Sequence, residues 1–107
     1  VILLHGCCHN PTGIDPTPEQ WAHIGDLLAA QGVLPLVDFA YQGLAVGVEE
    51  DRAGLLELTK KVKQMLICSS FSKNFGLYRE RIGACSIIGK DAAQTDVAFS
   101  VLLYVCR

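Results

Sequence analysis

The chain has 107 residues, of which 50% are hydrophobic and 19% charged, and its formal net charge is −2. This length suits one domain with a modest core, and the composition excludes wholesale disorder. Basic residues do not outnumber acidic ones, so the charge does not favour a nucleic-acid partner. The longest apolar stretch, residues 97–106, has only half of the roughly 20 residues that a membrane span needs.

The five cysteines predict reduced, mostly buried thiols in a cytoplasmic protein rather than a disulfide framework. Their number is odd, Cys7 and Cys8 are adjacent, and Cys68 and Cys85 lie within apolar runs. The chain also opens in an apolar run without an initiating Met. We therefore expect an internal segment of a longer protein.

The first third of the chain predicts a strand, a helix and a second strand. Residues 1–4 are continuously apolar, as in a strand that is buried on both faces of a parallel sheet. Residues 33–37 repeat this pattern and end at Asp38. The helix between the two strands begins with a capping box, formed by Thr17 and Gln20, and has Pro18 in its first turn. Gly32 is typical of the residue at which a helix ends.

The remaining elements continue the alternation. Residues 49–63 have the period of an amphipathic helix, and residues 65–68 predict a third strand. After a polar segment, residues 82–88 predict a fourth strand. Asp91 is a candidate N-cap for a last helix, whose apolar end at residues 97–106 we expect to be buried.

Alternating strands and helices predict the α/β class, with a mostly parallel sheet flanked by helices. The connection between the third and fourth strands, residues 71–81, has only eleven residues. A parallel crossover takes about a dozen or more residues, usually with a helix. An antiparallel fourth strand is therefore an open alternative.

Polar side chains of unusual chemistry follow the predicted strands. Ligands of open α/β sheets bind outside the carboxyl ends of the strands, and these residues fall there: Asn10, Asp38, Tyr41, Ser69, Ser70, Ser72, Lys73 and Arg81. Together they could hold a phosphorylated, partly anionic cofactor. Each also has an ordinary structural interpretation, since Asp38 could cap a turn, Tyr41 could pack in the core and Lys73 could be a solvated charge.

Four segments resemble the class I aminotransferases, and most closely the bacterial aspartate and aromatic-amino-acid enzymes, which use pyridoxal phosphate. These segments are His9–Gly13, Asp38–Gly43, Ser70–Tyr78 and Glu80–Gly83. The resemblance covers the chain from residue 1 to about residue 96, and the four segments together are highly specific. It implies that residues 1–107 form part of the large pyridoxal-phosphate-binding domain.

The resemblance also implies catalytic roles. Lys73 matches the lysine that binds the cofactor covalently through its amine and later moves a proton at the substrate α-carbon. Asp38 matches the carboxylate that pairs with the pyridine nitrogen, where an ion pair favours the protonated ring.

Four further residues match cofactor contacts of the family. Tyr41, which the resemblance also implies is a catalytic residue, and Asn10 match the residues that hydrogen-bond the phenolic oxygen of the cofactor. Ser70 and Arg81 match two of its phosphate ligands, and a guanidinium fork suits phosphate geometry.

The implied reaction transfers an amino group between aspartate, or an aromatic amino acid, and 2-oxoglutarate by a ping-pong route, in a cytoplasmic homodimer. The family's arginines for the substrate carboxylates lie outside this chain, so we expect residues 1–107 alone to be inactive. Two alternatives stay open: a catalytically silent fragment with a structural or binding role, and another enzyme of the same fold, such as a lyase.

Two rival motifs are weaker. His5, Cys7, Cys8 and His9 are potential metal ligands, but they are crowded and lack the second separated pair of a structural zinc site. We therefore expect no metal. Residues 70–73 also fit the S-x-x-K motif of serine β-lactamases, yet the S-D-N and K-T-G segments of those enzymes do not occur.

Overall fold

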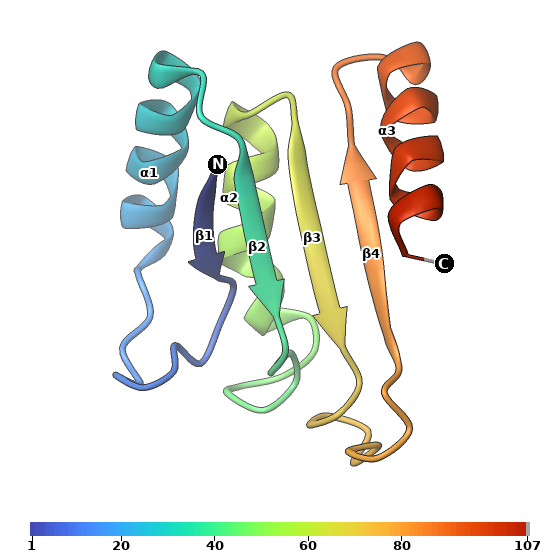
Figure 1. Cartoon of the computed structure of the whole chain (residues 1–107). Helices are drawn as coiled ribbons and strands as arrows, with labels where there is room; N and C mark the ends of the chain where they lie inside the picture. Colours follow the sequence, from blue (N-terminus) through green and yellow to red (C-terminus); the bar gives the residue numbers. More distant parts are fainter. Residues whose placement is uncertain (107) are drawn as a thin grey trace.

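A four-stranded sheet organises the chain, with its strands in the order β1-β2-β3-β4 (Figure 1). The computed structural model describes residues 1–106. The elements are β1 (Ile2–His5), α1 (Pro18–Gln31), β2 (Pro35–Phe39), a 3-10 turn (Glu50–Arg52), α2 (Ala53–Lys61), β3 (Met65–Ser70), β4 (Gly83–Ile88) and α3 (Ala92–Val105). The predicted α/β class is confirmed.

The first three strands are parallel, and β4 runs antiparallel to β3. The antiparallel alternative for the last strand is thus the correct one. Residues 71–81 form a compact connection without a helix, after which β4 runs back along β3.

Helices α1 and α2 cover one face of the sheet and enclose the core. Strand β2 alternates buried and half-buried residues, and its buried side chains Val37 and Phe39 point toward the helices. Trp21 and Leu28 from α1 and Leu58 from α2 complete this core.

The start of α1 follows the predicted capping box. Thr17 accepts a hydrogen bond from the Gln20 backbone N–H, and the Gln20 side chain accepts one from the Thr17 N–H. Gly32 ends the helix in the left-handed conformation, with φ of 61°. Helix α2 is shorter than the predicted 49–63, because residues 50–52 adopt a 3-10 turn and Val62 is already extended.

Three burial predictions are wrong. Val1, Ile2 and Leu3 are exposed, because β1 is an edge strand and no helix covers its outer face. Helix α3 contains no buried residue, so its apolar end is exposed beside β4 rather than packed (Figure 1). Among the cysteines, which are all free thiols, only Cys7 is buried.

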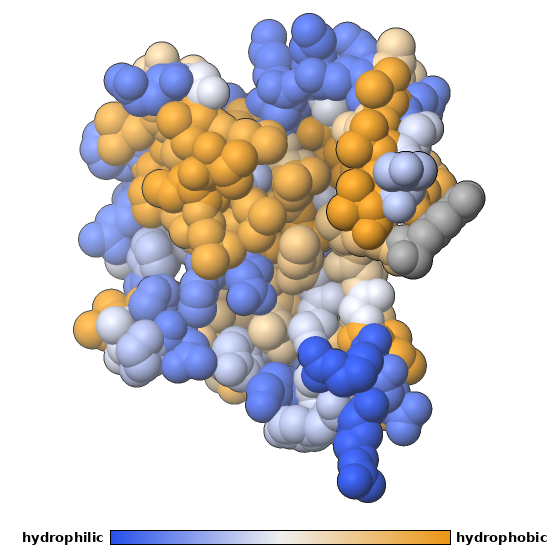
Figure 2. Space-filling model, viewed as in Figure 1, coloured by the Kyte–Doolittle hydropathy of each residue, from blue (hydrophilic) through white to orange (hydrophobic). Residues whose placement is uncertain are grey.

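The sheet face opposite α1 and α2 divides into an apolar row and a polar row. Strand register aligns four apolar residues in the first row: Leu3, Leu36, Leu66 and Ile87. Two positions nearer the carboxyl ends of β1–β3, it aligns His5, Asp38, Cys68 and Cys85. Figure 2 shows apolar surface in the upper half of this view, beneath a hydrophilic rim, and mostly polar surface around the loops below.

Within the described part of the chain, no helix is both long and apolar enough to cross a membrane.

Candidate functional site

The candidate site lies at the end of the sheet where β1, β2 and β3 end and β4 begins, which we call the carboxyl edge. The connecting loops gather at this edge (Figure 1). All six residues that the resemblance matches belong to these strand ends and loops: Asn10, Asp38, Tyr41, Ser70, Lys73 and Arg81. The fold therefore brings the predicted set to one edge.

Asp38 and Ser70 are half-buried residues of the strands themselves. Asp38 alternates with the core residues Val37 and Phe39, so its carboxylate lies on the face away from α1 and α2. In the sheet register Asp38 stands between His5 of β1 and Cys68 of β3. Ser70 lies two residues beyond Cys68 and therefore on the same face as Asp38.

Lys73 lies in the turn that follows β3. The backbone N–H of Gly76 donates to the Lys73 carbonyl at 3.2 Å, and Gly76 has a φ of 67° that suits glycine. The Lys73 ammonium is exposed and lies 4.3 Å from the centre of the Tyr78 ring. Its neighbour Asn74 donates from Nδ2 to the Gln42 carbonyl at 3.2 Å, which joins this turn to the loop after β2.

Arg81 precedes β4 and closes the same turn. Its backbone is left-handed, with φ of 53°, and its Nη1 donates to the Tyr78 carbonyl at 3.3 Å. The N–H of Phe71 donates to the Ile82 carbonyl at 3.1 Å. This bond keeps the residues next to Ser70 and Arg81 side by side.

Asn10 and Tyr41 lie on the two remaining loops. Asn10 is exposed, and its backbone N–H donates to His5 Nδ1 at 3.2 Å. Tyr41 is half-buried and packs against the core, as its structural interpretation required. Its carbonyl accepts a contact from Cys8 Sγ at 4.0 Å, which links the loops after β1 and β2.

The structure gathers the six residues at one edge but does not join them to one another. Within residues 1–106, no side-chain hydrogen bond or ion pair connects two of them. The charges of Lys73, Arg81 and Asp38 have no ion-pair partner within the same residues. Two cations, one carboxylate and two hydroxyl groups are thus available to a ligand that carries both negative charge and a basic ring nitrogen.

Two aspartates that shape the loops were missed by the sequence analysis. The carboxylate of Asp15 accepts from the N–H groups of Cys8 and His9 at 2.7 and 2.8 Å. Asp51 is buried and accepts four backbone hydrogen bonds from residues 43–47. The available signal for Asp51 was an acidic residue just before a helix and just after a glycine-containing turn.

The potential metal ligands of the first loop are only partly gathered. Ligand atoms of Cys7, Cys8 and Asp51 lie within 4.8 Å of one another. Burial is the main reason that the pKa of Cys7 rises to about 12, which disfavours the thiolate that a metal needs. Both Asp51 oxygens already accept backbone hydrogen bonds. The residues of this cluster therefore stabilise the loops around them and are poorly suited to bind a metal.

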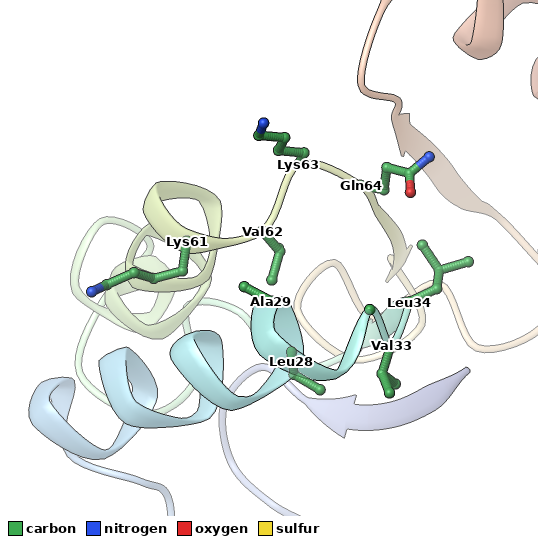
Figure 3. Close-up of a pocket in the computed structure, with 9 residues that line it drawn as sticks. Leu28, Ala29, Val33, Leu34, Lys61, Val62, Lys63 and Gln64 are labelled. Carbon is green, nitrogen blue, oxygen red and sulfur yellow. The ribbon is translucent and has the colours of Figure 1, made fainter.

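A pocket of about 330 Å³ lies at the opposite end of the sheet, between the ends of α1 and α2 (Figure 3). Its labelled lining includes Val33 and Val62, and the ammonium groups of Lys61 and Lys63 point away from it. It gathers no set of convergent polar groups, unlike the carboxyl edge.

The sheet and its helices define an α/β fold, in which a lysine, a carboxylate and a guanidinium form a candidate site at the carboxyl ends of the strands. The chain belongs to the class I and II aminotransferase family, whose model matches residues 1–99.

Relatives and solved structures agree with this family. The aspartate aminotransferase of Haemophilus influenzae is 61% identical over 107 residues, which are 100% of this chain and 27% of that protein. A solved aromatic amino acid aminotransferase with 3-indolebutyric acid superposes with a TM-score of 0.93 at 48% identity, covering 96% of this chain and 26% of that one.

A second solved structure, the aromatic-amino-acid aminotransferase of Burkholderia pseudomallei, is covalently bound to pyridoxal phosphate. It has a TM-score of 0.87 at 40% identity and covers 92% of this chain and 25% of that one. The chain thus spans about a quarter of the length of the relatives it matches.

Proposed function

We propose that this chain is part of the large, pyridoxal-phosphate-binding domain of an aminotransferase. The proposed reaction moves an amino group between aspartate, or an aromatic amino acid, and 2-oxoglutarate by a ping-pong route. The observation that carries the proposal is the presence of all six family-matched residues at one sheet edge, with the charges of Lys73, Arg81 and Asp38 unpaired within residues 1–106. The relatives reported above are aminotransferases, which favours this reaction over a lyase.

The donor set fits pyridoxal phosphate. The β3–β4 turn brings the backbones of Ser70 and Arg81 near each other, and the Arg81 guanidinium and the Ser70 hydroxyl would bind the phosphate. The Asp38 carboxylate would accept a hydrogen bond from the protonated pyridine nitrogen and hold its charge. Asn10 and Tyr41, from neighbouring loops, would donate to the phenolic oxygen.

Lys73 would bind the cofactor covalently and act as the base. When bound, pyridoxal phosphate withdraws electrons from the α-carbon of the amino acid. A neutral Lys73 amine could then take the proton from that α-carbon and later deliver it to carbon C4′ of the cofactor. To do so, Lys73 must leave the Tyr78 ring, over which its ammonium now lies. The exposed position of Lys73 in a turn permits this movement.

We further propose that the parent enzyme is a cytoplasmic homodimer that acts on amino acids and 2-oxo acids, with no nucleic-acid or membrane partner. The free thiols support a reducing compartment. In the apolar row of the sheet Leu3 is exposed and the other three residues are half-buried, which supports a further contact over this row in the longer protein.

The test is amino transfer by the full-length protein with aspartate and 2-oxoglutarate. Oxaloacetate and glutamate should form in equal amounts, without release of ammonia. Lys73→Ala should abolish this turnover, whereas Lys63→Ala, which removes an exposed lysine at the opposite end of the sheet, should leave it unchanged. Ammonia release without glutamate would replace the transferase proposal with a lyase.

A further inference from the structure

Cys68 and Cys85 face each other across the antiparallel strands β3 and β4, where the register pairs them directly. The type of pairing follows from the neighbouring hydrogen bond. The N–H of Phe71 donates to the carbonyl of Ile82, its own opposite residue, which marks a hydrogen-bonded pair. Because the two types alternate along an antiparallel ladder, the Cys68–Cys85 pair, three steps away, is non-hydrogen-bonded.

Non-hydrogen-bonded pairs bring side chains closest. Their Cα atoms are about 4.5 Å apart, and disulfides span Cα separations of about 4.4–6.8 Å. Both side chains lie on the sheet face opposite α1 and α2, in the row that also contains Asp38. The backbone therefore already holds the two sulfurs in a position that a disulfide can bridge.

We propose that Cys68 and Cys85 are a redox-sensitive pair that a peroxide converts into a β3–β4 disulfide beside Asp38. This inference stands on the strand register and not on the proposed function. It adds a covalent modification site to the edge that holds the candidate cofactor residues.

The two thiols differ in exposure, which assigns their roles. Cys85 is exposed and Cys68 is half-buried, so peroxide reaches Cys85 first. The Cys85 sulfur bonds to one peroxide oxygen and the O–O bond breaks. This step releases one water molecule and converts Cys85 to a sulfenic acid. The Cys68 thiolate then attacks that sulfur, the S–O bond breaks, and a second water forms. Two thiols and one hydrogen peroxide thus give one disulfide and two waters.

The second step should be slow at neutral pH and faster in base. Burial first, and then the facing Cys85 and the adjacent Asp38, raise the pKa of Cys68. Because only the thiolate attacks, ring closure should accelerate about tenfold per pH unit while the pH stays below that pKa.

Adjacent cysteines elsewhere in the chain provide an internal comparison. Cys7 and Cys8 are neighbours in sequence, but Cys7 is buried and its pKa is raised to about 12. We expect this pair to stay reduced under conditions that oxidise Cys68 and Cys85.

The experiment treats the full chain with hydrogen peroxide in native buffer, blocks remaining thiols and maps tryptic peptides. The expected result is loss of two of the five thiols, with the peptides 64–73 and 82–90 linked within one chain and not between two chains. The Cys7→Ser variant should lose the same two thiols. Cys68→Ser should instead accumulate a sulfenic acid at Cys85, and Cys85→Ser should keep Cys68 reduced.

Three results would overturn the proposal. They are five thiols retained after treatment, a disulfide that joins Cys7 to Cys8 or involves Cys106, and a Cys68–Cys85 link that forms only between two chains. Each is read from the wild-type chain, so the interpretation does not depend on whether a variant folds.

Discussion

Asp51 fixes the loop that follows Tyr41. Its two carboxylate oxygens accept backbone hydrogen bonds of 2.8–3.3 Å from Gly43, Ala45, Val46 and Gly47. Burial by itself would raise the pKa of Asp51, but these four N–H groups outweigh it and hold the pKa below its usual value. The folded chain therefore stabilises the carboxylate, and through it the position of Tyr41.

Asp51→Asn should lower the free energy of unfolding by about 2–4 kcal/mol at pH 7, because an amide NH₂ group would face backbone donors. Since the folded pKa is lowered, this contribution is complete above the unfolded value of about 3.9 and is lost as the pH falls through the folded pKa. Urea unfolding at pH 7 and pH 3 checks this expectation.

The matched control is Asp26→Asn, which removes an exposed ion pair with Lys61. Its cost should be under about 1 kcal/mol. Equal effects of the two variants, or an Asp51→Asn difference that does not shrink in acid, would contradict the assigned role of Asp51.

At the scale of elements, α1 and α2 approach closely at a glycine. A methyl group at Gly54 in α2 would overlap the indole ring of Trp21 in α1. Trp21 is 4% exposed and belongs to the core, so the ring has little room to move. This contact sets the spacing of the helix layer that supports β2 and Asp38.

Gly54→Ala should therefore destabilise the chain by about 1–3 kcal/mol through overpacking, despite the better helix propensity of alanine. Thermal unfolding followed by circular dichroism measures the effect. Gly32→Asn is the control, since Gly32 has open space around it and a left-handed φ that Asn adopts. A Gly54→Ala chain as stable as wild type would show that the helices separate freely.

The ends of helices and strands were predictable from the sequence where neighbouring residues alone determine them. The capping box at Thr17 and the glycine at Gly32 fixed both ends of α1, because caps act through neighbouring backbone groups. The position of the six candidate residues at one edge was predictable for a related reason, since parallel strands bring their carboxyl ends to one edge.

The features that the sequence did not predict depend on strand register, on loop folding and on which helices cover the sheet. Asp51 becomes visible only when its loop folds back over it, and the facing of Cys68 and Cys85 requires the alignment of two strands. The exposure of β1 and α3 could not be anticipated, because hydropathy reports what a segment could bury and not what covers it.

At the scale of the whole molecule, the sheet has one covered and one open face. The apolar row of the open face, formed by Leu3, Leu36, Leu66 and Ile87, lies beside the polar row that contains Asp38. Exposed apolar patches of this kind are association surfaces. We expect the isolated chain to self-associate through this face and to be silent with aspartate and 2-oxoglutarate.

Leu3→Glu should reduce this self-association, because Leu3 belongs to the apolar row and is 58% exposed. Leu27→Glu is the matched control, since Leu27 is 52% exposed but lies on α1. Sedimentation velocity should show a larger shift toward monomer for the first variant. A monomeric wild-type chain, or equal effects of the two variants, would contradict association through the open face.

Binding of pyridoxal phosphate through Lys73 at the carboxyl edge of this sheet is the step on which the proposed function depends. The direct measurement is borohydride reduction of the full-length protein with bound cofactor, followed by peptide mapping. We expect a covalent label on Lys73 and none on Lys63, and we expect Lys73→Ala to lose the label but retain some cofactor through Arg81 and Ser70. A label on any other lysine, or no label in protein that binds the cofactor, would contradict this expectation.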